Sequence, residues 1–427
     1  MPRINHIILV LAVYPPEPVV SAQNGRDLAM HLAREGACVT VLCPSPSRPI
    51  GTDYSRLKAD RLPKVSREDG VDVVRLPSFT APQSRLLPRL RESWSFGRHA
   101  CRYLKVLPTP PDVVYMNAWP LFSQAFVARY CRARKIPLVM QVMDVYPESL
   151  LEKLPRPLRW PIQWPLLTLD RWIARQAARV VVISESMRLR YQDTRRLPPE
   201  KVALVHTWID DAMFQAMPDR KQSAAHYGVP HDLLTFIFLG NIGPVAGVEL
   251  MIEAFHKAAL PTSQLLIIGD GSSKARCIRL AQELGATDRV RFISDPAASN
   301  VPGLLSLADV CLLPMRKGAG ASSLPSKMMA YMLAGKPILA SVDEDGDAAR
   351  CIREAGCGWI VQPDNAQALA EGFLAVHAID WPALAKMGNA GAVYGVVQFS
   401  KATGLARMSD VIASVRGQRR NGRGGAA

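Results

Sequence analysis

Short apolar runs recur along the whole chain, and stretches with the apolar spacing of helices separate most of them. In the first half these runs cover residues 7–13, 38–43, 71–76, 112–116, 137–142, 179–183 and 202–205. In the second half they cover residues 235–239, 264–268, 290–292, 310–313, 337–340 and 359–361. Strands that alternate with helices form βαβ units, which build parallel sheets with helices on both faces. The chain is therefore predicted to be an α/β protein with doubly wound sheets.

The length of 427 residues exceeds what one hydrophobic core ordinarily holds, so more than one domain is expected. The polar, proline-containing segment 210–231 is predicted to link two domains, over residues 1–209 and 232–398. A helix is expected over 399–415, with packing back on the N-terminal domain as one arrangement open to it. The tail 416–427, rich in Gly and Arg, is predicted to be disordered. Two doubly wound, Rossmann-like domains facing across a cleft are the simplest architecture.

Composition points to a folded protein in a reducing compartment. The chain is 48% apolar and 21% charged, and it contains no run of the roughly 18–20 apolar residues that a bilayer span needs. Residues 7–14 are short for a signal peptide and lack a cleavage site, which favours a buried first strand. The eight cysteines show no metal-binding spacing, so we expect reduced, structural thiols in a cytoplasmic protein.

A net charge of +15 indicates an anionic partner. Residues 84–105 and 153–179 interleave arginine and lysine with tryptophan and leucine. This mixture suits the anionic inner surface of a membrane, where indoles lie at the headgroup level. A solvated basic face over an ordinary core stripe is the alternative for each stretch. Nucleic acid is a weaker interpretation, because no helix-turn-helix, RNP or zinc-finger pattern accompanies the charge.

The segment 324–341 carries the clearest chemical signal. A Pro–Ser step at residues 325–326 opens a helical run that breaks at Gly335, and an apolar strand follows. The amino end of a helix favours anions, yet Lys327 lies in this first turn. A lysine at that position makes more sense if a phosphate binds beside it. The segment therefore predicts a site for a diphosphate.

Two glycine-rich loops support a phosphate site in the same domain. Gly240-Asn241-Ile242-Gly243 follows the predicted strand 235–239 and precedes a helix expected over 248–259, and Gly269 follows the next strand. Glycine lets the backbone approach a ligand closely, and a helix amino end presents free N–H groups. One such loop is a weak signal, but two of them together with Lys327 indicate a nucleotide site.

These motifs carry a resemblance to a known family. The order Phe-Leu-Gly-Asn-Ile-Gly, Ile-Ile-Gly-Asp-Gly, Val-Arg-Phe-Ile, Leu-Pro-Ser-Lys and Ala-Gly-Lys-Pro-Ile is similar to the C-terminal half of GT-B glycosyltransferases of family 4. In the N-terminal half, Tyr-Pro-Pro-Glu and Met-Asp-Val-Tyr-Pro-Glu continue the resemblance, which covers residues 5–415. The most similar branch builds O-antigen, capsular and colanic-acid-type polysaccharides. The resemblance implies retention of anomeric configuration, no metal and no cofactor beyond a UDP- or GDP-linked sugar donor.

The chain departs from the family pattern at two places. Many relatives have two glutamates at positions that correspond to Ser322 and Ala330, although the similar branch often lacks both. Asp347 is our first candidate, and Glu344 the second, for the carboxylate that contacts the ribose or the donor sugar in place of these glutamates. The alternative interpretation is that both residues belong to a solvated acidic loop. Relatives also place a basic residue where this chain has Pro244.

The resemblance assigns the remaining roles. Lys327 and Arg316 would carry the diphosphate with the Gly243 backbone and Ser326, although Arg316 is equally well interpreted as a surface residue. The nucleotide base is expected near Phe292 and Ile293. Asp144 follows the strand predicted over 137–142, where relatives keep a residue that orients or deprotonates the acceptor. We expect a polyprenyl-diphosphate-linked saccharide as acceptor, at the cytoplasmic face of the membrane. The predicted catalytic residues are Asp144, Lys327 and Asp347.

Two other classes of function remain open. Relatives have basic residues where this chain has Pro244, with Ala246 two positions later, and usually where it has Met143, so a weakened GT-B partner or scaffold protein is one alternative. A nucleotide-sugar epimerase of the same fold is another. Asp343 and Asp345 have the spacing of a metal-binding pair, but they lie in a match to a metal-independent family.

Overall fold

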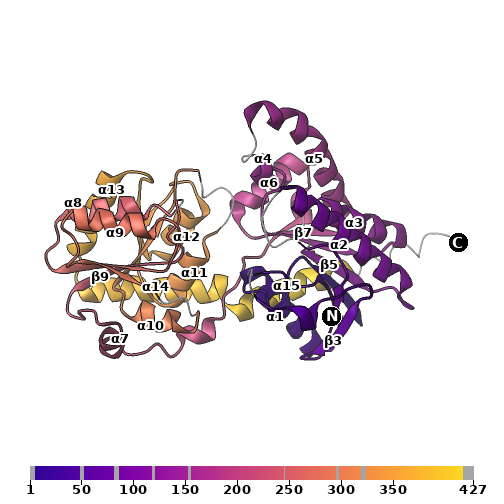
Figure 1. The fold of residues 1–427 in the computed structure, drawn as a ribbon, viewed down its shortest axis with the longest axis horizontal. Coiled ribbons are helices and arrows are strands. Elements are labelled where there is room, and N and C mark those ends of the chain that lie inside the picture. The colour runs from indigo at the N-terminus through magenta and orange to yellow at the C-terminus, as the bar shows by residue number, and fades with distance from the viewer. Residues whose placement is uncertain are drawn as a thin grey trace. The chain divides into compact units, whose positions relative to one another are not determined.

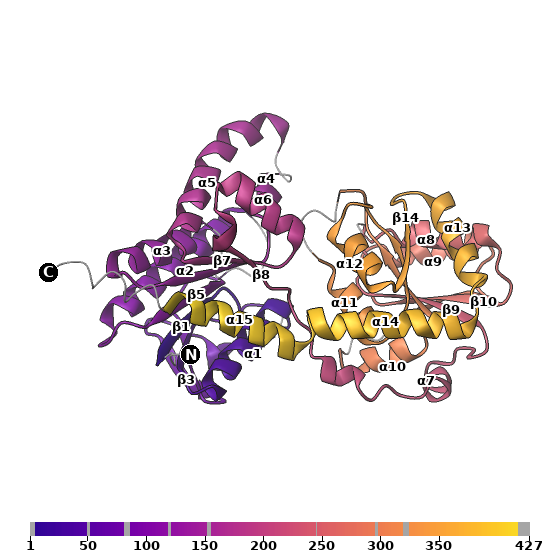
Figure 2. The same cartoon turned by 180° about the vertical axis from the view of Figure 1, so that it is seen from behind.

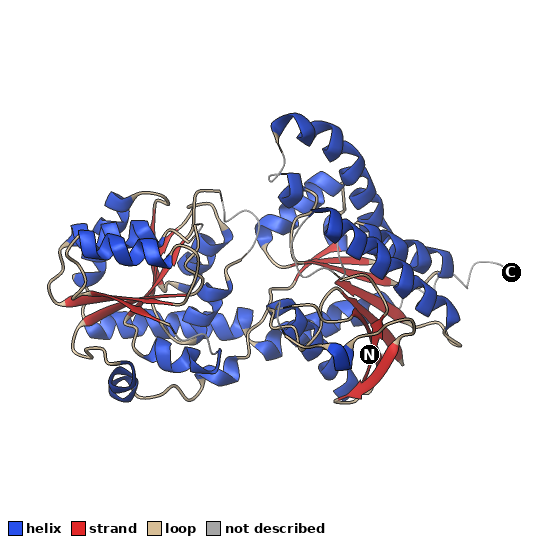
Figure 3. Ribbon diagram, in the orientation of Figure 1, coloured by secondary structure: helices blue, strands red, loops and turns tan. Residues whose placement is uncertain are grey.

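The computed structural model describes residues 5–48, 52–80, 86–117, 121–151, 155–244, 246–294, 298–318 and 324–416. The chain forms two compact units (Figure 1). Unit 1 combines Met1–Thr207 with Gly404–Ala427, and unit 2 is Trp208–Thr403. Each unit is a sheet covered by helices, as the colouring by secondary structure makes plain (Figure 3).

Unit 1 contains a sheet of eight strands in the order β3-β4-β2-β1-β5-β6-β7-β8 within the described residues. The strands are β1 (His6–Leu11), β2 (Cys38–Pro44), β3 (Lys64–Glu68), β4 (Val71–Leu76), β5 (Val113–Asn117), β6 (Leu138–Val142), β7 (Arg179–Val182) and β8 (Val202–Leu204). All neighbours pair in parallel except β3 and β4. The strand order reverses direction between β1 and β5, which is where open α/β sheets bind ligands.

The helices of unit 1 cover both faces of this sheet. They are α1 (Val20–Arg34), α2 (Leu86–Val106), α3 (Phe122–Arg134), α4 (Glu148–Leu151), α5 (Arg156–Gln176), α6 (Glu185–Arg195) and α15 (Lys401–Arg416). Helices α2, α3, α5 and α6 share one buried core with strand residues such as Ile8 and Val114. Helix α15 returns to unit 1 near the end of α1, where the Ser409 hydroxyl donates to Glu35 at 2.7 Å (Figure 2).

Unit 2 contains an all-parallel sheet of six strands in the order β11-β10-β9-β12-β13-β14 within the described residues. The strands are β9 (Leu234–Leu239), β10 (Ser263–Ile268), β11 (Val290–Ile293), β12 (Val310–Pro314), β13 (Ile338–Ser341) and β14 (Gly358–Val361). The strand order reverses between β9 and β12.

Helices cover both faces of the second sheet, with a separate core on each face. They are α7 (Arg220–Tyr227), α8 (Val248–Ala258), α9 (Lys274–Glu283), α10 (Val301–Ser306), α11 (Ser326–Leu333), α12 (Asp347–Ala355), α13 (Ala366–His377) and α14 (Trp381–Phe399). Phe236, Phe255 and Phe373 meet edge to face between β9, α8 and α13, with ring centroids 4.8–6.1 Å apart. Such pairs favour one packing arrangement over others.

Several details of the sequence analysis need correction. The sequence predicts a helix that begins at Asn24 with this residue as its cap, but α1 begins at Val20 and Asn24 lies buried inside it. Strand β3 was not expected. The segment 210–231, predicted to be a linker, holds α7 and is part of unit 2. The predicted tail, apart from Arg416 at the end of α15, lies outside the described residues.

The cysteines and the helix lengths agree in part with the expectations from composition. All eight cysteines are free, and seven are buried. Among the described residues, no helix is long and apolar enough to span a bilayer.

Candidate functional site

The candidate nucleotide site of unit 2 lies where β9 and β12 are neighbours and the strand order reverses. The loop after β9 carries Gly240, Asn241 and Gly243, and the loop after β12 leads through Arg316 to α11. Chain segments on opposite sides of such a switch point diverge and leave room for a ligand. The loops that carry the residues predicted from sequence in unit 2 therefore follow the carboxyl ends of neighbouring strands.

The two glycine-rich loops pack against each other through their backbones. The Gly240 N–H donates to the Ile268 carbonyl and the Ile242 N–H to the Asp270 carbonyl, each at 2.8 Å. Gly269 has φ +138°, and a Cβ there would lie 2.1 Å from the Gly240 carbonyl oxygen. No other residue fits this position without moving the neighbouring loop. Gly269 thus serves loop packing, and its predicted contact with nucleotide stays a prediction.

Lys327 of α11 lies against the end of β9. Its ammonium is 4.2 Å from the centroid of the Phe238 ring, and its Cε occupies the space beside Gly240, 2.3 Å from where a Cβ would be. The structure describes no carboxylate or hydrogen-bond acceptor that pairs with this partly buried ammonium. Burial lowers the pKa of Lys327 to about 8. An enclosed cation with a ring face as its neighbour favours an anionic ligand.

Tyr331, one turn further along α11, holds the helix in this position. Its hydroxyl accepts from the Leu239 N–H at 3.1 Å and lies 3.4 Å from the Leu239 carbonyl oxygen. Pro325, whose side chain forms no capping hydrogen bond, precedes the exposed Ser326 at the amino end of α11. Sequence reasoning missed Tyr331, although its spacing of one helical turn from Lys327 places both on the same face.

Arg316 reaches from the loop after β12 to the loop after β9. Its Nε and Nη2 donate to the Pro244 carbonyl at 3.1 and 2.9 Å. The guanidinium therefore lies beside Pro244, the position at which the sequence resemblance predicts a basic residue. Its side chain is exposed and keeps further N–H groups for a ligand. Asn241 is exposed on the same loop, whereas Gly243 is buried.

The predicted base-binding residues, Phe292 and Ile293, are partly buried at the end of β11. Lys274, which sequence reasoning missed, links this end to the loop after β10. Its ammonium donates to the Gly269 carbonyl at 3.1 Å and to the Ser294 hydroxyl. Lys274 could have been identified from the sequence, because it opens a helix directly after a Gly-Asp-Gly loop.

The acidic candidates lie after β13. Asp347 is the first residue of α12, is 1% exposed and accepts from Arg350 at 2.6 Å. Its carboxylate is therefore already engaged, and its role toward the ribose or donor sugar stays a prediction. Glu344 is exposed, and its carboxylate lies 4.0 Å from Arg353. Ser322 lies outside the described residues.

In unit 1, Asp144 is exposed in the loop that joins β6 to α4. Arg195, fully buried at the end of α6, anchors this loop. Its guanidinium donates to the Tyr146 carbonyl and to both carboxylate oxygens of Glu148, and its Nε donates to Asp170 at 2.7 Å. The carboxylate of Glu148, the first residue of α4, is thus bound to Arg195.

Arg195, Glu148 and Asp170 form a largely buried cluster of charged side chains in unit 1, here called the Arg195 cluster. The guanidinium also stacks over the Tyr191 ring at 4.3 Å. Burial raises the pKa of Asp170 to about 6, although Arg195 acts in the opposite direction. Every charged member has a partner, and this is the condition for tolerating buried charge. Sequence reasoning did not identify this cluster.

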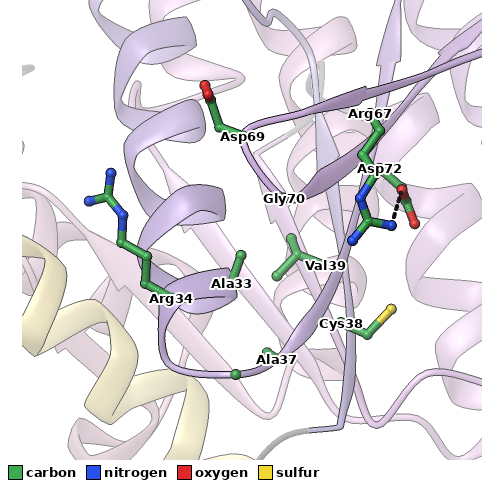
Figure 4. Close-up of a pocket in the computed structure, with 10 residues that line it drawn as sticks. Ala33, Arg34, Ala37, Cys38, Val39, Arg67, Asp69, Gly70 and Asp72 are labelled. Atoms are coloured by element: carbon green, nitrogen blue, oxygen red, sulfur yellow. Dashed lines mark hydrogen bonds and ion pairs between the residues drawn. The ribbon is translucent and has the colours of Figure 1, made fainter.

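A hollow of about 380 Å³ lies elsewhere on unit 1, between the end of α1 and the start of β2 (Figure 4). Arg67 and Asp72 on its wall pair at 3.3 Å, and Asp69 pairs with Arg26 at 2.6 Å. The hollow is at the amino ends of the strands, opposite the edge at which doubly wound sheets bind ligands. It is not a candidate nucleotide site.

Two family models match the chain, one in each half. Residues 23–208 match the glycosyl transferase 4-like domain, and residues 219–392 match glycosyl transferases group 1. The two parallel-sheet units and the glycine-rich switch-point site agree with this pair of domains. The chain belongs to the GT-B glycosyltransferases of family 4, and the protein is a glycosyltransferase.

Individual relatives are distant. The chain is 29% identical over 238 residues to the probable glycosyltransferase WbjE of Pseudomonas aeruginosa, covering 54% of this chain and 58% of the relative. It is 24% identical over 377 residues to the putative colanic acid biosynthesis glycosyl transferase WcaI of Escherichia coli K12, covering 86% and 91%. A solved structure of HepE from Anabaena in complex with UDP shares the fold, with a TM-score of 0.66, 16% identity and coverage of 96% and 100%.

Proposed function

We propose that the protein is a retaining glycosyltransferase of bacterial surface polysaccharide synthesis. It transfers a sugar from a nucleotide diphosphate donor to a lipid-linked saccharide acceptor. The relatives WbjE and WcaI support the transferase activity, and WcaI is named for colanic acid biosynthesis. HepE was solved with UDP, which supports a nucleotide donor. The observation that carries the proposal is the partly buried Lys327 ammonium, which has no anionic partner in the described part of unit 2.

The proposed chemistry follows from where charge develops. The bond between the anomeric carbon and the diphosphate oxygen breaks, and a bond from the same carbon to the acceptor hydroxyl oxygen forms on the same face. Negative charge accumulates on the departing diphosphate, so the Lys327 ammonium and the amino end of α11 lower the barrier. Arg316 supplies the second cation in place of the basic residue that Pro244 replaces. The acceptor proton passes to a base, for which Asp144 is our candidate.

Nucleotide titration tests the proposal directly. We expect UDP or GDP to raise the melting temperature, because a ligand that binds only the folded state stabilises it by about 2.7 kcal/mol at 100 times its Kd. Lys327→Met should abolish that shift, whereas Lys257→Met, a change on α8, should retain it. Absence of stabilisation by any nucleotide diphosphate or its sugar would favour the scaffold alternative. Release of an isomerised nucleotide sugar without acceptor would favour the epimerase.

We further propose that α5 brings the protein to the inner face of the membrane. Trp160 and Trp164 are 82% and 73% exposed and lie one helical turn apart. The amino-terminal half of α5 extends away from the rest of unit 1 (Figures 1 and 2). Exposed indoles beside arginines suit the headgroup region. The basic patch expected on α2 supports this less well, because Arg89 pairs with Glu92 at 2.9 Å and Arg85 lies outside the described residues.

Replacing Trp160 and Trp164 by serine should lower the binding of vesicles that contain phosphatidylglycerol by about tenfold or more, since each buried indole contributes on the order of 1–2 kcal/mol. Liposome flotation measures the change. Trp381→Ser, which removes a half-exposed indole from unit 2, is the matched control and should float like the wild type. Equal flotation of the double variant and the wild type would leave α5 as ordinary surface.

A further inference from the structure

A groove of about 330 Å³ lies along α2 of unit 1, between the helix and the loop that follows β4. Its lining residues are Phe79, Arg91, Trp94, Ser95, Arg98, His99 and Arg102. Arg91, Trp94, Arg98 and Arg102 are separated by three or four residues, so they form one row along the helix. The row from Arg91 to Arg102 is about 16 Å long at the helical rise. None of these described lining residues is acidic.

The three guanidiniums of the groove differ from the paired charges around them. Arg89, on the same helix, is bound to Glu92, and Arg48 approaches Glu92 at 3.7 Å. In the described structure no carboxylate pairs with Arg91, Arg98 or Arg102. Arg91 instead lies over the Phe79 ring at 4.1 Å. Like charges gathered without counter-charges repel one another, and an anionic ligand relieves this repulsion.

Trp94 supplies a rigid aromatic surface in the middle of the row. It is 50% exposed, and its other contacts are edge-to-face with Phe122 and Phe126 of α3, at centroid distances of 5.3 and 5.0 Å. The indole is therefore held in place while half of it remains open to a ligand. One ring nitrogen of His99 is 2.8 Å from the Ser95 carbonyl oxygen, which leaves the second nitrogen for a ligand.

We propose that the α2 groove binds an acidic saccharide segment. Carboxylate or phosphate substituents pair with the guanidiniums of Arg91, Arg98 and Arg102, and the apolar face of a sugar ring packs on Trp94. A row about 16 Å long exceeds a single phosphate or ring and suits a chain of sugars. A flat bilayer surface can contact side chains that protrude, such as Trp160 and Trp164 of α5. The α2 groove is instead shaped to hold an elongated ligand. The inference rests on the proposed role in polysaccharide synthesis and names an acidic glycan as the partner of unit 1.

The test compares an acidic and a neutral oligosaccharide of equal length, hexagalacturonate and maltohexaose, by calorimetric titration of the full chain. We expect binding of hexagalacturonate only. Arg98→Gln with Arg102→Gln should weaken it about tenfold or more, because two charge-assisted contacts are lost. The matched control is Arg132→Gln with Arg134→Gln, which removes the same charge from exposed positions on α3 and should bind like the wild type. All four arginines are exposed or at the surface of their helices, so the fold should persist.

Three outcomes would overturn the inference. Wild-type protein that does not bind hexagalacturonate lacks the site. Equal weakening in the groove variant and the α3 control would mean non-specific attraction to net charge. Loss of flotation with phosphatidylglycerol vesicles in the groove variant, with oligosaccharide binding unchanged, would assign the groove to lipid. Nucleotide binding, measured on the same samples, separates failure of this inference from failure of the proposed transferase reaction.

Discussion

Lys327→Met is expected to lower sugar transfer by about 100-fold or more, the usual cost of removing one group that stabilises developing negative charge. Methionine keeps most of the volume beside Gly240 and over the Phe238 ring, so the loss should come from charge alone. The same variant should be at least as stable as the wild type, because the removed ammonium is partly buried without a carboxylate partner among the described residues. Transfer assays and thermal unfolding measure the two effects. Full activity in Lys327→Met would contradict the proposed site.

The pH dependence of nucleotide affinity provides a control for this result. The pKa of Lys327 is lowered to about 8 by burial, so its charge is present below that pH and is lost above it. A bound diphosphate favours the charged form and raises the pKa in the complex. Affinity should therefore be constant below pH 8 and fall as the pH rises above it. Lys327→Met should bind weakly with no such fall between pH 7 and 9.5, and a decline identical to that of the wild type would assign the titration to another group.

Arg195→Met is expected to destabilise the protein by about 3–5 kcal/mol, since removing one partner of a buried ion cluster leaves the others unpaired. The carboxylates of Glu148 and Asp170 would lose their guanidinium, and the loop that carries Asp144 would lose the hydrogen bond to the Tyr146 carbonyl. Urea unfolding followed by circular dichroism measures the change. A loss below about 1 kcal/mol would show that the cluster is not required for stability.

One control variant and one double variant test the interpretation of the Arg195→Met result. Arg188→Gln removes a partly exposed arginine that pairs with Glu185 on the same helix, and it should cost no more than about 1 kcal/mol. Adding Asp170→Asn to Arg195→Met should recover part of the lost stability, because one unpaired buried carboxylate is removed together with its partner. Additive losses in the double variant would mean that the two residues do not interact energetically.

Most strands of both sheets could be predicted because buried parallel strands are continuous apolar runs. Strand β3 was missed because its sequence, Lys-Val-Ser-Arg-Glu, is polar and largely exposed at the sheet edge. The Asp69–Gly70 step that joins it to β4, with positive φ at both residues, is the hairpin signal that could have found it. Helix α7 was mistaken for linker because its face is polar apart from short buried residues such as Ala224.

The residues of the candidate nucleotide site that lie in local sequence motifs could be identified from the sequence. Gly240 and Lys327 each stand in a short motif, and the structure places them in contact. The contacts of Arg316 with Pro244 and of Arg195 with Glu148 join residues 72 and 47 positions apart. No periodicity or spacing within an element encodes such pairs, because tertiary folding alone brings them together.

The path of the chain between the two units limits how parts of this enzyme can be exchanged with those of relatives. Every described residue of the candidate nucleotide site lies within Trp208–Thr403, which is one continuous segment. Unit 1 is built from two segments, because α15 returns to it after unit 2 is complete. A chimera that keeps both units intact therefore needs two junctions, near Thr207 and Thr403. Joining two halves at the first junction alone would pair the N-terminal part of unit 1 with a foreign final helix. A single junction is thus disfavoured, and exchange of the whole of unit 2 is compatible with the fold.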